Sequence, residues 1–126
     1  MLPAAHRLRR SVDFERTVRR GTRAGRSTVV VHLLLDTEVQ DPPQVGFVVS
    51  KAVGNAVQRN VVKRRLRHAA ASHLTTLPAG SLAVVRALPP SRGADYGRLD
   101  QDLSGSLTRA VARATARVVG RDHRST

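Results

Sequence analysis

Residues 44–74 read QVGFVVSKAVGNAVQRNVVKRRLRHAAASHL, and the first part of this stretch has the alternation of a strand. Val45, Phe47 and Val49 fall on one face of an extended segment, because successive side chains of a strand point to opposite sides. β-branched and aromatic residues also favour strands. The pattern therefore predicts a strand over residues 44–51.

The second part of the stretch predicts a long helix. Gly54 permits unusual backbone angles, and Asn55 is a strong N-cap because its side chain accepts a hydrogen bond from an unpaired backbone N–H. Gln58 stands three residues later, at the spacing of a capping box. We expect a helix that begins at Ala56 and ends near Leu74.

One face of this predicted helix is basic. With about 100° between successive residues, five long polar side chains share an arc of about 140°, beside a narrow apolar stripe of Val62, Leu66 and Ala69. The helix contains no acid, so these like charges repel each other and a polyanion is their natural partner. We call the five residues the basic arc: Arg59, Asn60, Lys63, Arg64 and Arg67.

The whole chain is strongly basic. It has 126 residues, of which 22 are Lys or Arg and 9 are Asp or Glu, and its formal net charge is +13. Such an imbalance indicates nucleic acid or an anionic membrane surface as partner. No apolar run reaches the roughly 18 residues that a membrane-spanning helix needs, so we expect a cytoplasmic protein that binds nucleic acid and no membrane. The chain has no cysteine, which excludes disulfides and thiolate metal sites.

The N-terminal part predicts one short helix. The first ten residues are basic and are expected to be poorly ordered at the very start. A helix over residues 11–20 follows, with Ser11 as its cap and Gly21 as its stop. Phe14 and Val18 lie one turn apart on one side of this helix.

Three further segments complete the predicted sheet. A strand over residues 28–35 follows a short one around residues 23–26. The polar, proline-rich segment 36–43 predicts a hairpin-like loop. Residues 81–88 form the last strand, which two prolines terminate.

The C-terminal part predicts a helix from Asp95 to about Val119, and residues 120–126 are expected to fray. The element order is then α-β-β-β-α-β-α, which indicates an α+β sandwich with helices packed on a mostly antiparallel four-stranded sheet. We expect one domain over residues 1–126 with an ordered core over about 7–119. The buried stripe of the last helix is predicted to be Leu99, Leu103, Leu107, Val111, Ala114 and Val118.

The sequence shows no pattern of a protein catalytic centre. A protein nuclease needs carboxylates that converge on a metal, or a pair of histidines for acid–base work. The acids mostly suit first helical turns or a loop, and the five histidines are scattered. His32 is interpreted as a packed or half-exposed strand residue and not as a ligand, because no other His or acid has the spacing to complete a site with it. We expect no catalytic residue and no tightly bound metal in this chain.

The stretch that contains the basic arc has the pattern Lys51-x-x-Gly54-Asn55-Ala56-Val57-x-Arg59-Asn60-x-x-Lys63-Arg64-x-x-Arg67. This spacing resembles the signature of the protein subunit of bacterial ribonuclease P. Val61 stands where that family usually has a third basic residue, and since it lies off the arc we expect only a modest effect on binding. A second match, Ser-x-Asp-Phe-x-x-x-x-Arg-x-Gly over residues 11–21, falls on the first helix. The resemblance covers about residues 7–118.

The resemblance implies a role in tRNA maturation. In that family the RNA subunit is the catalyst and uses Mg²⁺ to remove the 5′ leader of precursor tRNA, while the protein binds the catalytic RNA and the leader. The basic arc, with Lys51 and Asn55 at its entrance, would then contact the catalytic RNA. Phe14 would line a leader-binding cleft, with Val18 in place of a second usual aromatic residue.

The resemblance also implies several features that the residues alone do not indicate. These are one protein monomer per RNA, Mg²⁺ held mainly by RNA, a fold shared with a ribosomal-protein domain, and a left-handed crossover between strands 44–51 and 81–88.

Other functions remain open from the residues alone. A structural RNA-binding protein of the ribosomal type would carry a similar basic helix without any processing role, and only the spacing around the arc argues against it. A DNA-binding module lacks a helix-turn-helix partner, and a stand-alone nuclease lacks a carboxylate cluster. Arg109, Arg113 and Arg117 could form a second RNA-facing surface or an ordinary solvated face.

Overall fold

A computed structural model describes residues 2–124, and the side chains of residues 2–120. The element order is the predicted α-β-β-β-α-β-α, with short 3-10 turns at Ala4–His6, Leu74–Thr76 and Pro89–Gly93. The main elements are α1 (Ser11–Arg20), β1 (Thr22–Gly25), β2 (Val29–Leu35), β3 (Gln44–Val48), α2 (Ala56–His73), β4 (Ser81–Ala87) and α3 (Tyr96–Arg124).

The four strands form one sheet in the order β1-β2-β4-β3. β2 is antiparallel to both β1 and β4, and β3 is parallel to β4. The predicted hairpin-like loop over residues 36–43 is therefore wrong, because β4 lies between β2 and β3. The loop instead crosses the start of β4, where the Gly80 N–H donates to the Asp41 carbonyl at 2.8 Å and the Asp36 N–H donates to the Gly80 carbonyl at 3.1 Å.

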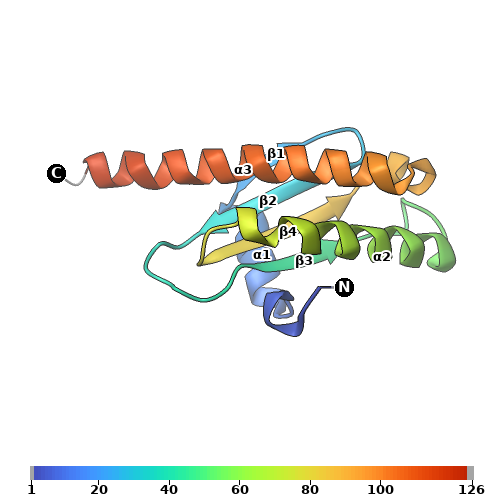
Figure 1. The fold of residues 1–126 in the computed structure, drawn as a ribbon, viewed down its shortest axis with the longest axis horizontal. Coiled ribbons are helices and arrows are strands. Elements are labelled where there is room, and N and C mark those ends of the chain that lie inside the picture. Colours follow the sequence, from blue (N-terminus) through green and yellow to red (C-terminus); the bar gives the residue numbers. More distant parts are fainter. Residues whose placement is uncertain (1, 125–126) are drawn as a thin grey trace.

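The sheet has helices on both faces (Figure 1). α2 and α3 cover one face, and α1 crosses the other. When β3 and β4 point upward with α2 toward the viewer, β4 lies to the left of β3, so the β3-α2-β4 crossover is left-handed. Nearly all such connections in proteins are right-handed. The left-handed crossover that the family resemblance implied is thus present.

The core lies between the sheet and the helices α2 and α3. Alternate residues of β2 are fully buried on this face, among them Val31 and Leu33 at 0% exposure. Most of the predicted stripe of α3 is buried against them, and Val111 and Val118 are half-buried. The opposite face carries the alternate residues of each strand, and α1 leaves part of it open.

Both ends of the chain differ from the prediction. Leu2 and Leu8 are buried, and the Leu8 N–H donates to the Val45 carbonyl at 3.0 Å, so the N-terminal segment lies along the edge of β3. At the other end α3 continues to Arg124, because Gly120 keeps a negative φ and does not terminate it. Residues 125–126 of the predicted frayed end lie outside the described residues, as does Met1.

Candidate nucleic-acid interface

α2 begins with the predicted capping box. The Asn55 side-chain oxygen accepts a hydrogen bond from the Gln58 N–H at 2.9 Å, and the Gln58 side-chain oxygen accepts one from the Asn55 N–H at 2.9 Å. This reciprocal pair satisfies two backbone donors at the start of the helix. The two amide N–H donors of the Asn55 side chain take no part in the cap and are available to a ligand.

The basic arc lies on the outer side of α2. Asn60, Arg64 and Arg67 are exposed, whereas Arg59 and Lys63 are half-buried. None of the four cations forms an ion pair with an acid within the described residues. The helix therefore holds an uncompensated positive face toward solvent, and this is the arrangement that the sequence predicts.

The remaining residues around the arc have distinct surroundings. Lys51 and Asn55 are exposed ahead of the helix, and Val61 is half-buried beside the arc. The Arg59 Nε atom is buried and has no hydrogen-bond partner among the described residues. Arg65, which lies off the arc, donates to the Ala94 carbonyl at 3.0 Å and fastens α2 to the segment before α3. The charge pattern alone did not separate this structural arginine from its neighbours.

α1 carries the predicted aromatic residue toward the sheet. The helix begins at Ser11, but Arg10 is its N-cap and no side chain caps it, so the predicted Ser11 cap is wrong. The Asp13 and Phe14 N–H groups donate instead to the Arg10 carbonyl. The helix ends at Gly21 as predicted.

Phe14 links α1 to the basic arc. Its half-buried ring lies over Gly46 of β3, and it lines a pocket of ≈ 240 Å³ together with Lys63 and Arg67 of the arc. Val18, the other predicted cleft residue, is 44% exposed one turn further along α1 and does not line this pocket. The fold thus brings Phe14, but not Val18, next to the arc.

On the face of the sheet that α1 crosses, a buried histidine lies between two arginines. In the strand register, Arg23 of β1 lies opposite His32 of β2, which lies opposite Val84 of β4. His32 is only 8% exposed, which confirms the prediction of a packed strand residue. Burial, and then the charges of Arg23 and Arg86, lower the pKa of His32 from its ordinary value. Sequence spacing could not show that these two arginines flank His32, because they approach it through the strand register.

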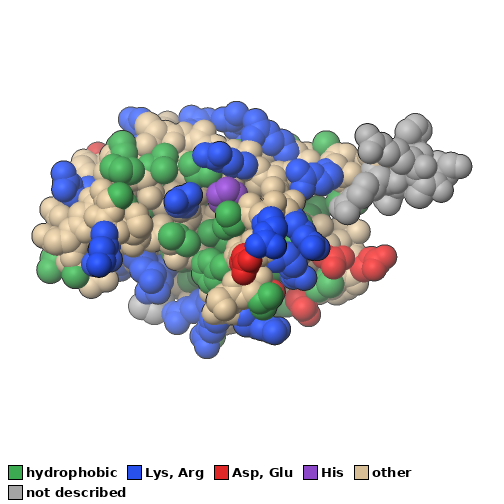
Figure 2. All heavy atoms as spheres, turned by 180° about the vertical axis from the view of Figure 1, so that it is seen from behind, with side chains coloured by type: hydrophobic (Ala, Val, Ile, Leu, Met, Phe, Trp, Pro, Cys, Tyr) green, Lys and Arg blue, Asp and Glu red, His purple; other side chains and the backbone are tan. Residues whose placement is uncertain are grey.

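Charge is unevenly distributed on this side of the molecule. Figure 2 shows Lys and Arg side chains over most of the face that carries α1, whereas the acidic side chains gather mainly toward one end. A surface of this kind attracts polyanions and leaves an acidic rim where they would be repelled.

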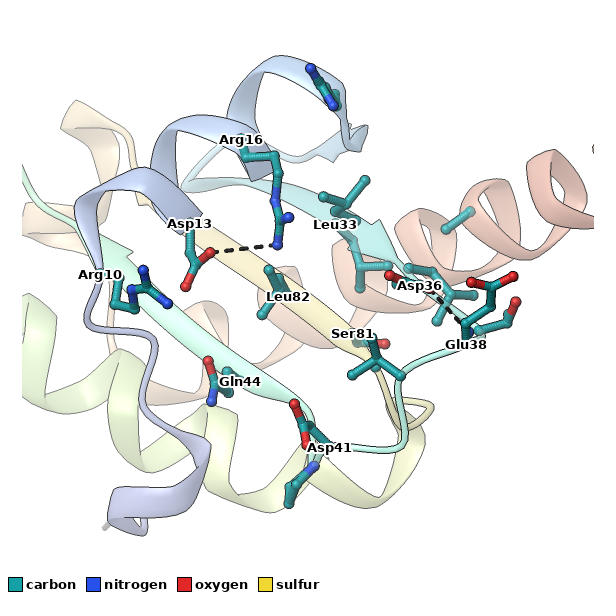
Figure 3. A pocket seen from close by; sticks show the side chains of 18 of the residues that line it. Arg10, Asp13, Arg16, Leu33, Asp36, Glu38, Asp41, Gln44, Ser81 and Leu82 are labelled. Atoms are coloured by element: carbon teal, nitrogen blue, oxygen red, sulfur yellow. Dashed lines mark hydrogen bonds and ion pairs between the residues drawn. The ribbon is translucent and has the colours of Figure 1, made fainter.

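A hollow of ≈ 1280 Å³, larger than the pocket beside Phe14, is not at the predicted site (Figure 3). It lies on the other side of α1, and none of the predicted site residues lines it. Arg10 and Arg16 on one wall face Asp36, Glu38 and Asp41 of the loop after β2. Because these carboxylates oppose the arginines, the hollow is less suited to a polyanion than the arc.

The described acids in the helices and at the start of α3 have structural partners. Asp100 lies 2.8 Å from the His73 ring, Asp13 and Glu15 pair with arginines of α1, and Asp102 accepts from Thr28 at 2.6 Å. Among the described residues, no group of three or more His, Cys, Asp or Glu could hold a metal ion. In the same part of the chain, no helix has the length and apolar character to cross a membrane.

Comparisons with known proteins agree on one family. The family model described as Ribonuclease P matches residues 2–111. A protein from Nocardioides sp. named "Ribonuclease P protein component" is 55% identical over 116 residues, which cover 91% of this chain and 99% of that protein. A protein of the same name from Beutenbergia cavernae is 57% identical over 114 residues, which cover 90% of this chain and 95% of the relative.

A solved structure has the same fold. The Staphylococcus aureus RNase P protein superposes with a TM-score of 0.75 at 28% sequence identity, and the match covers 84% of this chain and 95% of that one.

Proposed function

The chain belongs to the ribonuclease P protein family, and we propose that its basic arc binds the catalytic RNA of this enzyme while the open sheet face beside α1 binds the 5′ leader of precursor tRNA. The chain is a component of the endoribonuclease holoenzyme, and the catalytic RNA is a separate component of the same holoenzyme. The protein therefore contributes binding and positioning, and RNA carries the chemistry.

The observation that carries the proposal is the unpaired charge of the arc. Arg64 and Arg67 are exposed and have no acidic partner among the described residues, so they can reach phosphate oxygens without breaking an internal contact. Arginine matches phosphate geometry with paired hydrogen bonds. Four phosphate contacts by the arc cations would give a slope of about −3 in log K against log salt.

The leader-binding part of the proposal is supported by the neighbourhood of Phe14. Single-stranded RNA binds to surfaces that combine cations with aromatic rings on which bases stack. Phe14 supplies the ring, Lys63 and Arg67 share its pocket, and Arg86 is exposed on the same sheet face. With Val18 in place of a second aromatic residue, binding should depend on phosphates more than on stacking.

We place the Mg²⁺ of the holoenzyme on RNA. The described acids of the helices cap a helix start or form internal pairs. The loop acids Asp36, Glu38 and Asp41 line the other hollow and lie away from the arc. The donor set of this chain therefore does not fit a metal site at the proposed interface. One protein monomer per RNA completes the proposal.

A reconstitution tests it. The protein is mixed with a bacterial ribonuclease P RNA and a precursor tRNA at low Mg²⁺, and leader release is followed. We expect the protein alone to be inert but to rescue cleavage by the RNA, and Arg64→Gln/Arg67→Gln to lose about tenfold of that rescue. Arg59 is left intact, because its buried Nε would make the result a test of packing.

The matched control is Arg16→Gln/Arg19→Gln, which removes the same charge from arginines that are already paired with acids on α1. It should keep the rescue within about twofold, since exposed ion pairs contribute little. Cleavage by the protein alone would overturn the proposal. Binding to structured RNA without any rescue would favour the ribosomal-type function.

A further inference from the structure

A second basic surface lies at the β1 edge of the sheet, away from α2. It combines arginines from α1, from β1 with its following turn, and from α3, and every one of them is exposed. None forms an ion pair with an acid that the structure describes. We call these residues the edge arginines: Arg20, Arg23, Arg26, Arg109, Arg113 and Arg117.

The fold holds several of these side chains in place. Arg113 donates to the Arg23 carbonyl, and Arg117 donates to the Arg20 carbonyl at 2.6 Å. Each of these bonds uses one N–H of a guanidinium that has five, so the others remain available. Arginines fixed in this way lose less freedom when they bind an anion than freely rotating ones.

Arg26 is held by a different device. A side chain on Gly105 of α3 would begin 2.6 Å from the Arg26 Nε atom, so the guanidinium lies directly on the helix. Glycine inside a helix costs about 1 kcal/mol relative to alanine. Here the glycine makes room for a charged side chain at the surface, next to the helix face that carries Arg109.

The spacing of the edge arginines suits a chain of phosphates. Arg109, Arg113 and Arg117 follow each other every four residues on one face of α3, at intervals of about 6 Å. The arginines of β1 and α1 run beside them, because the two hydrogen bonds above join the rows. A row of regularly spaced, preorganised cations is complementary to a sugar-phosphate backbone.

The sheet connects this surface to Phe14. The strand register places Gly25, Val30, Arg86 and Val48 in one row across all four strands, and Arg86 and Val48 are exposed. The Phe14 ring lies over Gly46, two residues before Val48 on β3. The row spans three inter-strand spacings, about 14 Å. A stacked strand with about 3.4 Å per nucleotide covers this distance with roughly four nucleotides.

We propose that the leader of precursor tRNA crosses the open sheet face from Phe14 toward β1, and that the phosphates of its distal part bind to the edge arginines. This inference rests on the proposed leader-binding function and extends it to a second surface. Nucleotides beyond roughly the fourth from the Phe14 end would then contribute to binding through phosphate contacts alone.

The test compares two leader lengths in the reconstituted holoenzyme. The two precursors have leaders of about 3 and about 12 nucleotides, below and above the span of the face. Each precursor is cleaved at a concentration well below its KM, and kcat/KM is measured. The variant is Arg23→Gln/Arg109→Gln, since neither side chain makes a hydrogen bond within the described residues. The control is Arg16→Gln/Arg19→Gln, which lowers the net charge equally.

We expect the edge variant to match the wild type within about twofold on the short leader and to lose about five- to tenfold on the long one. Its salt slope on the long leader should be shallower by about 1.4, the value for two lost contacts with single-stranded RNA. The control should keep the long-leader advantage. Thermal unfolding of both variants checks that the fold is intact.

Three results would overturn the inference. An equal loss of kcat/KM on both leaders would mean that the edge arginines bind the catalytic RNA or stabilise the fold. No loss of kcat/KM on either leader would mean that they do not bind the leader. The same loss on the long leader in the control variant would show that the effect comes from net charge and not from the position of the edge arginines. If the wild-type protein fails to rescue even the short leader, the proposed function itself is wrong, so the two failures are distinguishable.

Discussion

The ring of Phe14 lies so close over Gly46 that no side chain fits at position 46. A β-carbon there would fall inside contact distance of three ring atoms, of which even the farthest, Cε2, would be only 3.1 Å away. Glycine on β3 is thus what allows α1 to lie against the sheet at this point. The contact also fixes the position of Phe14 beside Lys63 and Arg67.

Gly46→Ala should therefore displace Phe14 and loosen α1. We expect a loss of about 1–3 kcal/mol in the free energy of unfolding, the usual cost of overpacking, measured by urea denaturation. Gly93→Ala is the control, because nothing lies within 4 Å of a β-carbon there. Equal stability of the two variants would show that the ring moves aside without cost.

Asn55 has two separable roles, as a helix cap and as a residue of the interface. Asn55→Asp keeps the side-chain oxygen that accepts from Gln58 and adds a negative charge where the helix dipole favours it. Its stability should stay within about 0.5 kcal/mol of the wild type, while its affinity for the catalytic RNA falls several-fold through repulsion of phosphates. Asn55→Ala should instead lose about 1 kcal/mol of stability. Unchanged RNA affinity in the aspartate variant would remove Asn55 from the interface.

His32 makes stability depend on pH near neutrality. Burial, Arg23 and Arg86 lower the pKa of His32 in the folded protein, so the unfolded chain binds a proton more readily. The stabilisation is complete above the ordinary histidine value of 6.5 and is lost as the pH falls from there through the folded pKa. Urea denaturation at pH 8, 7, 6 and 5 should show a decline that His32→Gln reduces. Identical pH profiles would rule His32 out as its source.

Asp102 ties the β1–β2 turn to α3. It is 3% exposed, and its carboxylate accepts from Thr28 at 2.6 Å and from Arg98 at 3.3 Å. Burial alone would raise the pKa of Asp102, but the Thr28 hydroxyl and Arg98 outweigh it and hold the pKa below the ordinary 3.8. The carboxylate therefore stabilises the fold above that value, and this contribution is lost as the pH falls through the folded pKa.

Asp102→Asn should lower the free energy of unfolding by about 1–3 kcal/mol at pH 7, because a buried charge-assisted bond is lost. The difference from the wild type should shrink as the pH is brought toward 3. Asp41→Asn, at an exposed loop position, is the matched control and should change stability by less than about 0.5 kcal/mol. A difference in the free energy of unfolding that stays constant at all pH values would mean that Asp102→Asn destabilises the fold through packing and not through the lost charge.

The parts of the fold that local sequence specifies were predictable. The capping box of Asn55 and Gln58 marks the start of α2, and the leucine spacing marks the buried face of α3. The basic arc follows from helix geometry alone, since its members share one face wherever the helix packs. Its role in RNA binding is still a prediction, because the fold and the family do not show which side chains touch RNA.

Two of the mispredicted features depend on distant parts of the chain. Residues 36–43 have the composition of a hairpin loop, yet β4, from residues 81–87, pairs between the strands they connect. Leu2 and Leu8 stand alone among charged residues, and their burial depends on the edge of β3. Sequence periodicity cannot show contacts of this kind, because it indicates which side of an element is apolar and not which distant segment packs beside it.

The N-terminal segment and the arginines of α3 together have a consequence for the free protein. The Leu8 N–H donates a hydrogen bond to a backbone carbonyl of the outer strand β3. The Arg113 guanidinium donates one to a backbone carbonyl of the outer strand β1. Exposed strand edges are templates for aggregation, and proteins protect them with coverings and charges. A chain made before its RNA is available must stay unaggregated while alone. At these two positions, a second copy could add a strand only by first breaking a contact that the folded chain already makes.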